Sequence, residues 1–193
     1  MTTWVLFAGP PGVGKSTLAH AVERRINDKR IGSFGMEGGA VTLDKDQVRA
    51  ALFPGKLTDY TQQQDDLCMG AILQAAAYLT ERSGAAFVLL DGRTFSRSTQ
   101  IETVIAAAAA AGARWRIVRV SCPDEVAEAR LAAESQKEVS GAGAHPAENR
   151  DAALYRKIKR EFEPIHHPKL DVDSTQPGEA NVDAVLRYLA HFS

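Results

Sequence analysis

The sequence Gly-Pro-Pro-Gly-Val-Gly-Lys-Ser-Thr at residues 9–17 is the strongest indication of how the chain folds. It matches the pattern G-x-x-x-x-G-K-[ST] and follows an apolar run at residues 4–8, which we predict to be a buried strand. Apolar residues then recur at helical spacing, which predicts a helix from residue 15 to about residue 27. A glycine-rich turn between a strand and a helix directs backbone N–H groups and the positive end of the helix at one point. The pattern therefore predicts a phosphate-binding loop.

The side chains of this loop predict how a nucleoside triphosphate and its metal are held. Lys15 can bridge the terminal phosphates, the hydroxyl of Ser16 can bind Mg²⁺, and Thr17 is suited to the α-phosphate. The alternative is a chance glycine-rich turn, which the position between a strand and a helix disfavours. We predict ATP and Mg²⁺ as cofactors, bound by these loop residues: Gly9, Gly12, Val13, Gly14, Lys15, Ser16 and Thr17.

The rest of the chain alternates between apolar runs and helical patterns. Further strands are predicted at residues 40–43, 86–90, 115–120 and 170–173. Further helices are predicted at residues 46–52, 61–82, 98–111, 123–136, 149–162 and 180–192. Such alternation predicts an α/β fold of three layers, in which helices cover both faces of a parallel sheet. We expect a single domain over residues 1–193, since no linker-like segment interrupts the pattern.

Composition narrows the classes of function. The 193 residues are 45% hydrophobic and 24% charged, with a formal net charge of −1, as in an ordinary globular domain. The absence of a basic excess argues against binding to extended nucleic acid. We predict a cytoplasmic protein, because no apolar run could span a membrane, no leader precedes the first strand, and Cys68 and Cys122 have no metal-ligand spacing. The oligomeric state is left open.

Charged residues arrive where ligands bind in parallel sheets, beyond the carboxyl ends of the strands. Asp44 ends the strand at residues 40–43, Asp46 begins the next helix, and Arg49 follows one turn later. We predict that Asp46 receives the proton of an acceptor hydroxyl and that Arg49 clamps the substrate. Asp44 is expected to reach the substrate or the shell of the Mg²⁺. The alternative is a helix cap at Asp46 and a solvated arginine at Arg49.

The strand at residues 86–90 ends in a second acidic group. Four apolar residues followed by Asp91 are typical of a Walker B strand, whose carboxylate supports Mg²⁺ through water. Many buried strands also end in aspartate simply because it favours turns. Arg93 and Arg97 follow in the next loop, where they are predicted to contact the substrate, with surface solvation as the alternative.

A glycine- and alanine-rich break near residue 141 predicts a lid over roughly residues 134–150. An arginine in or beside a lid can stabilise the negative charge that gathers during phosphoryl transfer. Arg130 is the first choice for this role and Arg150 the second, while solvated positions on helix surfaces are the alternative. The histidines are interpreted as surface or loop residues rather than metal ligands: His145, His166 and His167.

Taken together, these residues resemble the P-loop kinases of the AAA_33 type over nearly the whole chain. The resemblance rests on these segments: residues 9–17, Leu43-Asp44-x-Asp46-x-x-Arg49, Leu90-Asp91-Gly92, Arg130 and Asp173-Ser174-Thr175. It implies a five-stranded parallel sheet of order 2-3-1-4-5. It also implies an acceptor-side carboxylate at Asp46, a substrate arginine at Arg49, and a segment beside adenine that includes Thr175 and Pro177.

Adenylylsulfate kinase, polynucleotide 5′-hydroxyl kinase and antibiotic phosphotransferases are similar in layout. The sequence lacks the basic loop with Pro-Phe that follows the third strand in adenylylsulfate kinases. The leading prediction is therefore transfer of the γ-phosphoryl group of ATP to a hydroxyl of a small molecule. A kinase for nucleic-acid or nucleotide 5′ ends is one alternative, and an ATP-binding switch or regulatory NTPase is another. A GTPase is disfavoured, because the chain has no Asn-Lys-x-Asp motif.

Overall fold

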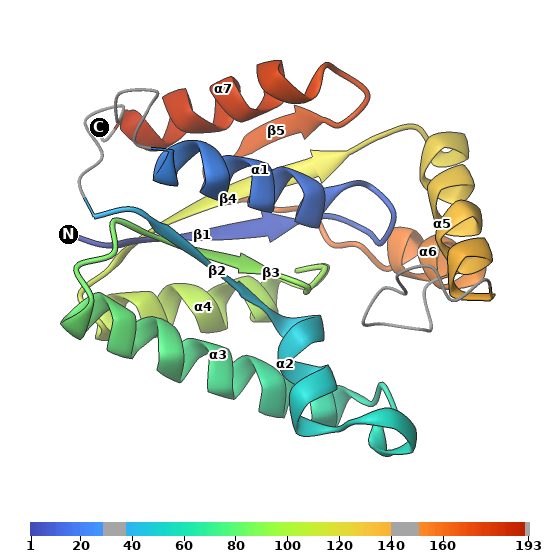
Figure 1. Cartoon of the computed structure of the whole chain (residues 1–193), viewed down its shortest axis with the longest axis horizontal. Helices are drawn as coiled ribbons and strands as arrows, with labels where there is room; N and C mark the ends of the chain where they lie inside the picture. The colour runs from blue at the N-terminus through green and yellow to red at the C-terminus, as the bar shows by residue number, and fades with distance from the viewer. Residues whose placement is uncertain (29–37, 140–150, 192–193) are drawn as a thin grey trace.

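Five strands form one parallel sheet in the order β2-β3-β1-β4-β5, which confirms the predicted order (Figure 1). The computed structural model describes residues 1–28, 38–139 and 151–191, with side chains throughout except at residues 136–139. The strands are β1 (Thr3–Ala8), β2 (Ala40–Asp44), β3 (Phe87–Asp91), β4 (Arg114–Ser121) and β5 (Leu170–Asp173). Because all neighbouring strands run parallel, their carboxyl ends meet at one edge.

The helices cover both faces of the sheet, as predicted. Helices α1 (Lys15–Asn27) and α7 (Gly178–Ala190) lie on one face, and α3 (Gln62–Arg82) and α4 (Ser98–Ala110) lie on the other (Figure 1). Three further helices stand at the edge where the strands end: α2 (Lys45–Leu52), α5 (Asp124–Val139) and α6 (Ala152–Arg160). The described chain is therefore a three-layer α/β fold. Helices also surround the edge of the sheet at which the strands end.

The alternation of side chains along β1 builds a core on each side of the sheet. Val5 and Phe7 pack into the cluster beneath α1 and α7, whereas Trp4 and Leu6 pack into the cluster against α3 and α4. All four are fully buried. Burial of a large apolar side chain stabilises the fold by about 1.5–3 kcal/mol. These two clusters fix the central strand, and with it the start of the glycine-rich loop.

Some helix boundaries differ from the predicted ones. Helix α5 continues to Val139, so it includes the first part of the predicted lid, and residues 140–150 lie outside the described chain. Helix α6 begins at Ala152 because the side chain of Asp151 caps it, accepting a hydrogen bond from the N–H of Leu154 at 2.7 Å. A 3₁₀ turn (Gly55–Leu57) follows α2.

Both cysteines are free thiols, Cys68 buried and Cys122 partly exposed. Burial raises the pKa of the Cys68 and Cys122 thiols above the ordinary value. Within the described residues, none of the helices has the length and apolar character needed to cross a bilayer.

Candidate active site

The glycine-rich loop lies between β1 and α1 and is shaped by backbone geometry that glycine alone adopts easily. Gly9 has φ 146°, and a Cβ there would lie 2.3 Å from the carbonyl oxygen of Val120. Only glycine lets the loop pass this close to β4. Gly14 caps α1 in a left-handed conformation, no side chain caps the helix, and its first turn contains no acidic residue. The first amides of α1 are thus available to an anion, which fits a triphosphate.

Lys15 and Ser16 stand between two hollows. The Lys15 side chain is 6% exposed, and its ammonium group donates a hydrogen bond to the carbonyl oxygen of Pro10 at 2.8 Å. Both residues line a hollow of about 520 Å³ toward α7 and a smaller one of about 190 Å³ toward α2. We call these the nucleotide hollow and the acceptor hollow.

The nucleotide hollow contains Arg130, the predicted lid arginine. Its guanidinium donates to the side-chain oxygen of Ser174 at 2.9 Å and to the carbonyl oxygen of the same residue at 3.2 Å. Ser174 and Gln176 line this hollow, whereas Thr175 and Pro177 do not. The backbone N–H and the hydroxyl of Thr175 instead donate to the carboxylate of Asp173. The adenine contacts expected at Thr175 and Pro177 stay predictions.

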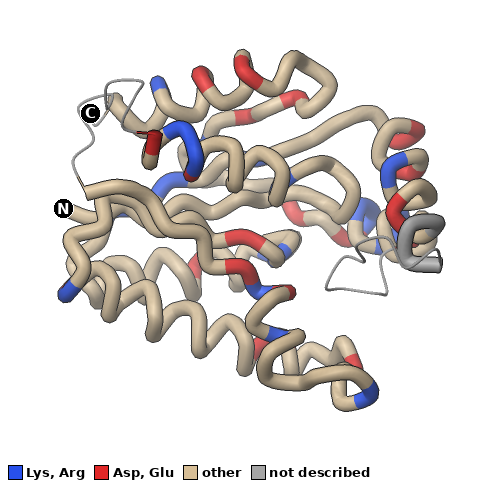
Figure 2. The backbone as a smooth tube through the Cα atoms, viewed as in Figure 1, with Lys and Arg blue, Asp and Glu red and all other residues tan. Residues whose placement is uncertain are grey.

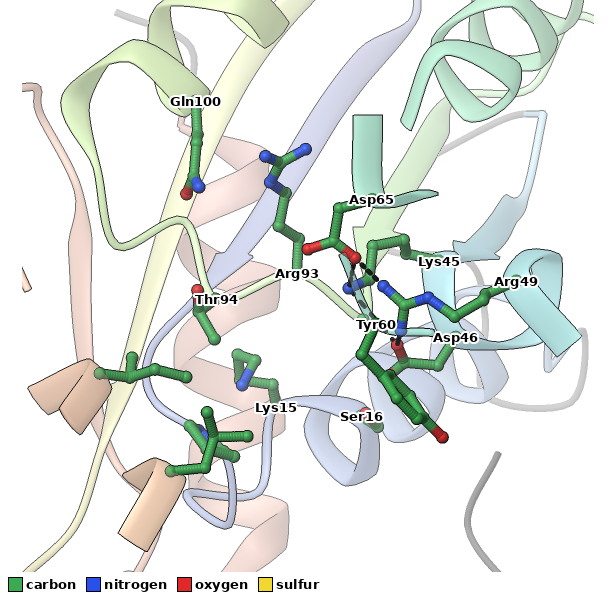
Figure 3. Close-up of a pocket in the computed structure, with 14 residues that line it drawn as sticks. Lys15, Ser16, Lys45, Asp46, Arg49, Tyr60, Asp65, Arg93, Thr94 and Gln100 are labelled. Carbon is green, nitrogen blue, oxygen red and sulfur yellow. Dashed lines mark hydrogen bonds and ion pairs between the residues drawn. The ribbon is translucent and has the colours of Figure 1, made fainter. Parts of the chain in front are cut away.

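The acceptor hollow contains Asp46 within a network of opposite charges (Figure 3). An Arg49 nitrogen lies 3.2 Å from the Asp46 carboxylate, and another contacts the carboxylate of Asp65 on α3. The guanidinium also lies 5.2 Å from the ring centroid of Tyr60, a residue with a strained φ of 54°. Asp46 and Arg49 therefore line the hollow and are not a helix cap and a solvated cation, whereas their predicted roles toward a substrate stay predictions.

Lys45 belongs to the same network, although the sequence did not single it out. Its ammonium group lies 2.9 Å from the Asp65 carboxylate and 3.5 Å from that of Asp46. Burial lowers the pKa of Lys45 to about 8, against the pull of the nearby Asp46 charge. A lysine between two aspartates at a helix start is usually solvated, so the sequence offers no signal for this burial. Asp65 and Tyr60 were missed as well, because the sequence offers no signal that they lie in this hollow.

The ends of β2 and β3 bring two carboxylates together, since Asp44 pairs with Asp91 in the sheet register. Asp44 is the cap of α2: one carboxylate oxygen accepts hydrogen bonds from the N–H groups of Asp46 at 2.7 Å and Gln47 at 3.4 Å. Burial and the neighbouring Asp91 charge raise the pKa of Asp44. The expectation that Asp46 begins the helix is wrong, because α2 begins at Lys45 behind this cap.

Asp91 meets a requirement of a metal-supporting group. It is 1% exposed, and within the described residues neither of its carboxylate oxygens has a hydrogen-bond partner. A buried carboxylate without partners is costly unless a cation compensates it. The pair predicted to hold Mg²⁺, Ser16 and Asp91, therefore fits a divalent cation.

The two arginines of the loop after β3 lie in different environments. Arg93 is buried, lines the acceptor hollow, and approaches the carboxylate of Asp66 at 3.2 Å. The Arg97 side chain is 60% exposed, lies 3.8 Å from Glu161, and lines a neighbouring surface hollow that shares Arg93 with the acceptor hollow. Of the residues predicted to bind the substrate, the structure thus gathers Asp46, Arg49 and Arg93 in one hollow, and leaves Asp44 and Arg97 outside it.

Other residues near the predicted lid have structural partners. Arg156 on α6 forms two 2.7 Å hydrogen bonds to the carboxylate of Glu128 on α5 and so joins the two helices. His167 contacts Glu102 at 2.6 Å on the surface. Arg150 and His145 lie outside the described residues, so their predicted roles stay predictions.

Solved structures of kinases share this fold over nearly the whole chain. The APS kinase of Mycobacterium tuberculosis, in complex with AMPPNP and APS, superposes with a TM-score of 0.69 at 19% identity, covering 98% of both chains. A putative kinase of Chloroflexus aurantiacus gives 0.67 at 18%, covering 100% of this chain and 99% of its own. A gluconokinase of Sinorhizobium meliloti gives 0.61 at 16%, covering 97% and 91%. No curated protein sequence matches the chain.

The loop, the strand order and these likenesses define the class of fold, which is that of the P-loop kinases. The profile of the AAA_33 family, an AAA domain, matches residues 5–165. Since this match covers most of the chain, the chain belongs to the AAA_33 family.

Proposed function

We propose that this protein is an ATP- and Mg²⁺-dependent kinase that transfers the γ-phosphoryl group to a hydroxyl of a small molecule. One observation carries the proposal: Lys15 and Ser16 line both hollows, with Arg130 in one and Asp46 in the other. A triphosphate lying along the loop from the nucleotide hollow would present its terminal phosphate toward Asp46. The kinases among the structural relatives support the same class of reaction.

Ser16, with Asp91 behind it, would hold the Mg²⁺ of the nucleotide. The ion would neutralise charge on the phosphate oxygens when bound. The protein's own contribution on this side is to position the triphosphate through the loop amides and the Lys15 ammonium group. Arg130, held in place by Ser174, would add positive charge beside the phosphates.

Asp46 would orient the acceptor hydroxyl and take its proton. The acceptor oxygen then forms a bond to the γ-phosphorus, the bond from that phosphorus to the bridging oxygen breaks, and ADP leaves with the bonding electrons. Arg49 and Lys45 would fix the Asp46 carboxylate so that one oxygen faces the acceptor. The 190 Å³ volume of the acceptor hollow favours a small substrate over a polymer.

The test is the substitution Asp46→Asn. It should lower the transfer rate by at least about 100-fold, because the amide cannot accept the proton, while ATP affinity measured by calorimetry stays within a few-fold of wild type. Asp183→Asn, which changes a partly exposed carboxylate on α7 that pairs with Arg25 on α1, is the matched control and should leave both quantities unchanged. Undiminished transfer by Asp46→Asn would remove Asp46 from this role.

The acceptor itself is found by a transfer screen with labelled γ-phosphate over hydroxylated metabolites, antibiotics, nucleotides and short 5′-hydroxyl oligonucleotides. We expect a metabolite or antibiotic to be phosphorylated. Salt-sensitive transfer to oligonucleotides would favour the 5′-end kinase instead. Nucleotide hydrolysis at the same slow rate with every acceptor would favour a regulatory NTPase.

A further inference from the structure

Three potential metal ligands from three elements converge at the carboxyl ends of β2 and β3. His20 lies on α1, Asp44 ends β2 and Asp91 ends β3, and one ligand atom from each lies within 4.8 Å of the others. The parallel register sets the two aspartates side by side, and acidic positions gather at these strand ends (Figure 2). His20 follows Ser16 by four residues, so the two side chains leave the same face of α1.

The buried carboxylate of Asp91 is the second, independent sign of a ligand here. It is 1% exposed, and neither oxygen has a hydrogen-bond partner among the described residues. The chain is also shaped to bring β3 close to the Asp44 carboxylate: Gly92 has φ 80°, and a Cβ there would lie 2.6 Å from the Asp44 oxygen. Only glycine allows this approach, which concentrates negative charge in a small space.

The imidazole of His20 has a carboxylate beside it. Its Nδ1 lies 3.6 Å from the carboxylate of Glu23. That carboxylate is itself fixed by Thr42 on β2, whose N–H and hydroxyl donate to its two oxygens at 3.1 Å and 2.8 Å. Metal-binding histidines usually donate one ring nitrogen to a carboxylate and bind the cation with the other, and Glu23 lies close enough to take this part after a small movement.

We propose that His20, Asp44 and Asp91 form a divalent-cation site that binds Mn²⁺ in preference to Mg²⁺ and does so without nucleotide. Mg²⁺ binds oxygen ligands and keeps its waters, whereas an imidazole with two carboxylates suits transition metals. Ligand atoms bound to one such ion lie about 3 Å from one another. Small side-chain rotations would bring the three ligand atoms from their present separations to that distance. The His20 side chain is 39% exposed and has the freedom to do this.

The competing role for His20 is that of a protonated counter-ion, which would pair with the carboxylates itself and leave no place for a metal. The two roles differ in measurable ways. If His20 is a metal ligand, the variant His20→Asn should bind Mn²⁺ more weakly than the wild type. The variant of its supporting group, Glu23→Gln, should do the same. A counter-ion shows neither loss.

The experiment is Mn²⁺ titration of the full-length chain without nucleotide, followed by the electron paramagnetic resonance of free Mn²⁺. We expect one bound ion, displaced by Mg²⁺ only at a concentration at least tenfold higher. His20→Asn and Glu23→Gln should each weaken Mn²⁺ binding by about 10- to 100-fold and bring the Mn²⁺ and Mg²⁺ affinities closer together. His167→Asn, at the surface beside Glu102, is the matched control and should change nothing.

The result that overturns the proposal is absence of Mn²⁺ binding by the wild-type chain, or equal affinities in wild type and His20→Asn. Thermal unfolding without metal checks that each variant is folded. Asp91 takes part in both proposals, but nucleotide and acceptor are absent from this titration, so its outcome does not depend on phosphoryl transfer. Loss of kinase activity with an intact Mn²⁺ site, or the reverse, separates the two proposals.

Discussion

The two hollows beside Lys15 differ in the chemical groups that line them. The nucleotide hollow is lined by the glycine-rich loop, by apolar side chains such as Leu18 and Val182, and by Arg130, which Ser174 holds. The acceptor hollow is formed by charged side chains that hold one another, with Asp46, Arg49 and Lys45 all nearly buried. Recognition by backbone tolerates little change in the loop but requires few particular side chains. Recognition by a charge network depends on every member.

The difference predicts where substitutions act. On the nucleotide side, the loss of one polar side chain removes one hydrogen bond. On the acceptor side, the loss of one charge leaves its partners buried without compensation, so both stability and transfer should suffer.

Arg49→Met is expected to have the largest effect. The change keeps most of the side-chain volume but removes one of the two cations, Arg49 and Lys45, that contact both Asp46 and Asp65. Removal of one partner from a buried ion pair costs about 3–5 kcal/mol, which should appear as a lower free energy of unfolding in urea. Transfer should be lost in the folded fraction, while ATP affinity per folded molecule stays near that of wild type.

Arg93→Met is the matched control for that prediction. Arg93 is also buried in the wall of the acceptor hollow, but the side chain of its partner, Asp66, is 59% exposed and is rehydrated when the arginine is removed. The cost should therefore be clearly smaller than for Arg49→Met. Equal costs would mean that burial of the arginine, rather than the network, sets the stability of this side.

The contrast also explains what the sequence could predict. The loop at residues 9–17 is contiguous, and its function follows from backbone geometry, so the phosphate site was predictable residue by residue. The sheet order was available from the family resemblance, and the strand ends placed Asp44 and Asp91 together. Distances between these groups were not available from the chain alone.

The missed residues depend on packing between elements that are distant in sequence. Asp65 lies in the acceptor hollow only because helix α3 packs against helix α2. Lys45 can be buried there only because the carboxylates of Asp65 and Asp46 pair with its ammonium group. His20 was overlooked because a lone histidine on a helix has no metal-ligand spacing. Its partners arrive from β2 and β3, and only the register of the sheet reveals them.

Lys45 should give the network a pH dependence. Its pKa is lowered from 10.5 in the unfolded chain to about 8 in the folded one, chiefly by burial. Between these two values the unfolded chain binds the extra proton, so stability rises as the pH increases from about 8 to about 10.5. The rise should be at most roughly 3 kcal/mol.

The measurement is urea unfolding across this pH range for the wild type and for Lys45→Met. The difference between the two free energies of unfolding should grow in favour of the wild type as the pH rises. Lys159→Met, which removes an exposed lysine beside Asp124, should show no such trend. A difference for Lys45→Met that is constant with pH would contradict the lowered pKa.

Ser174→Ala should have the smallest effect and bears on the nucleotide side. It removes the side-chain acceptor of Arg130 but leaves the hydrogen bond to the Ser174 carbonyl oxygen. One hydrogen bond contributes about 0.5–1.5 kcal/mol, so ATP affinity should fall by about two- to tenfold, with stability nearly unchanged. Thr175→Val is the comparison, because the Thr175 hydroxyl binds Asp173 instead of facing the hollow. Thr175→Val could instead lower the affinity for ATP more than Ser174→Ala does. In that case the contact inferred from the family resemblance outweighs the one seen at Arg130. Binding of the nucleotide would then depend on side chains more than the loop backbone implies.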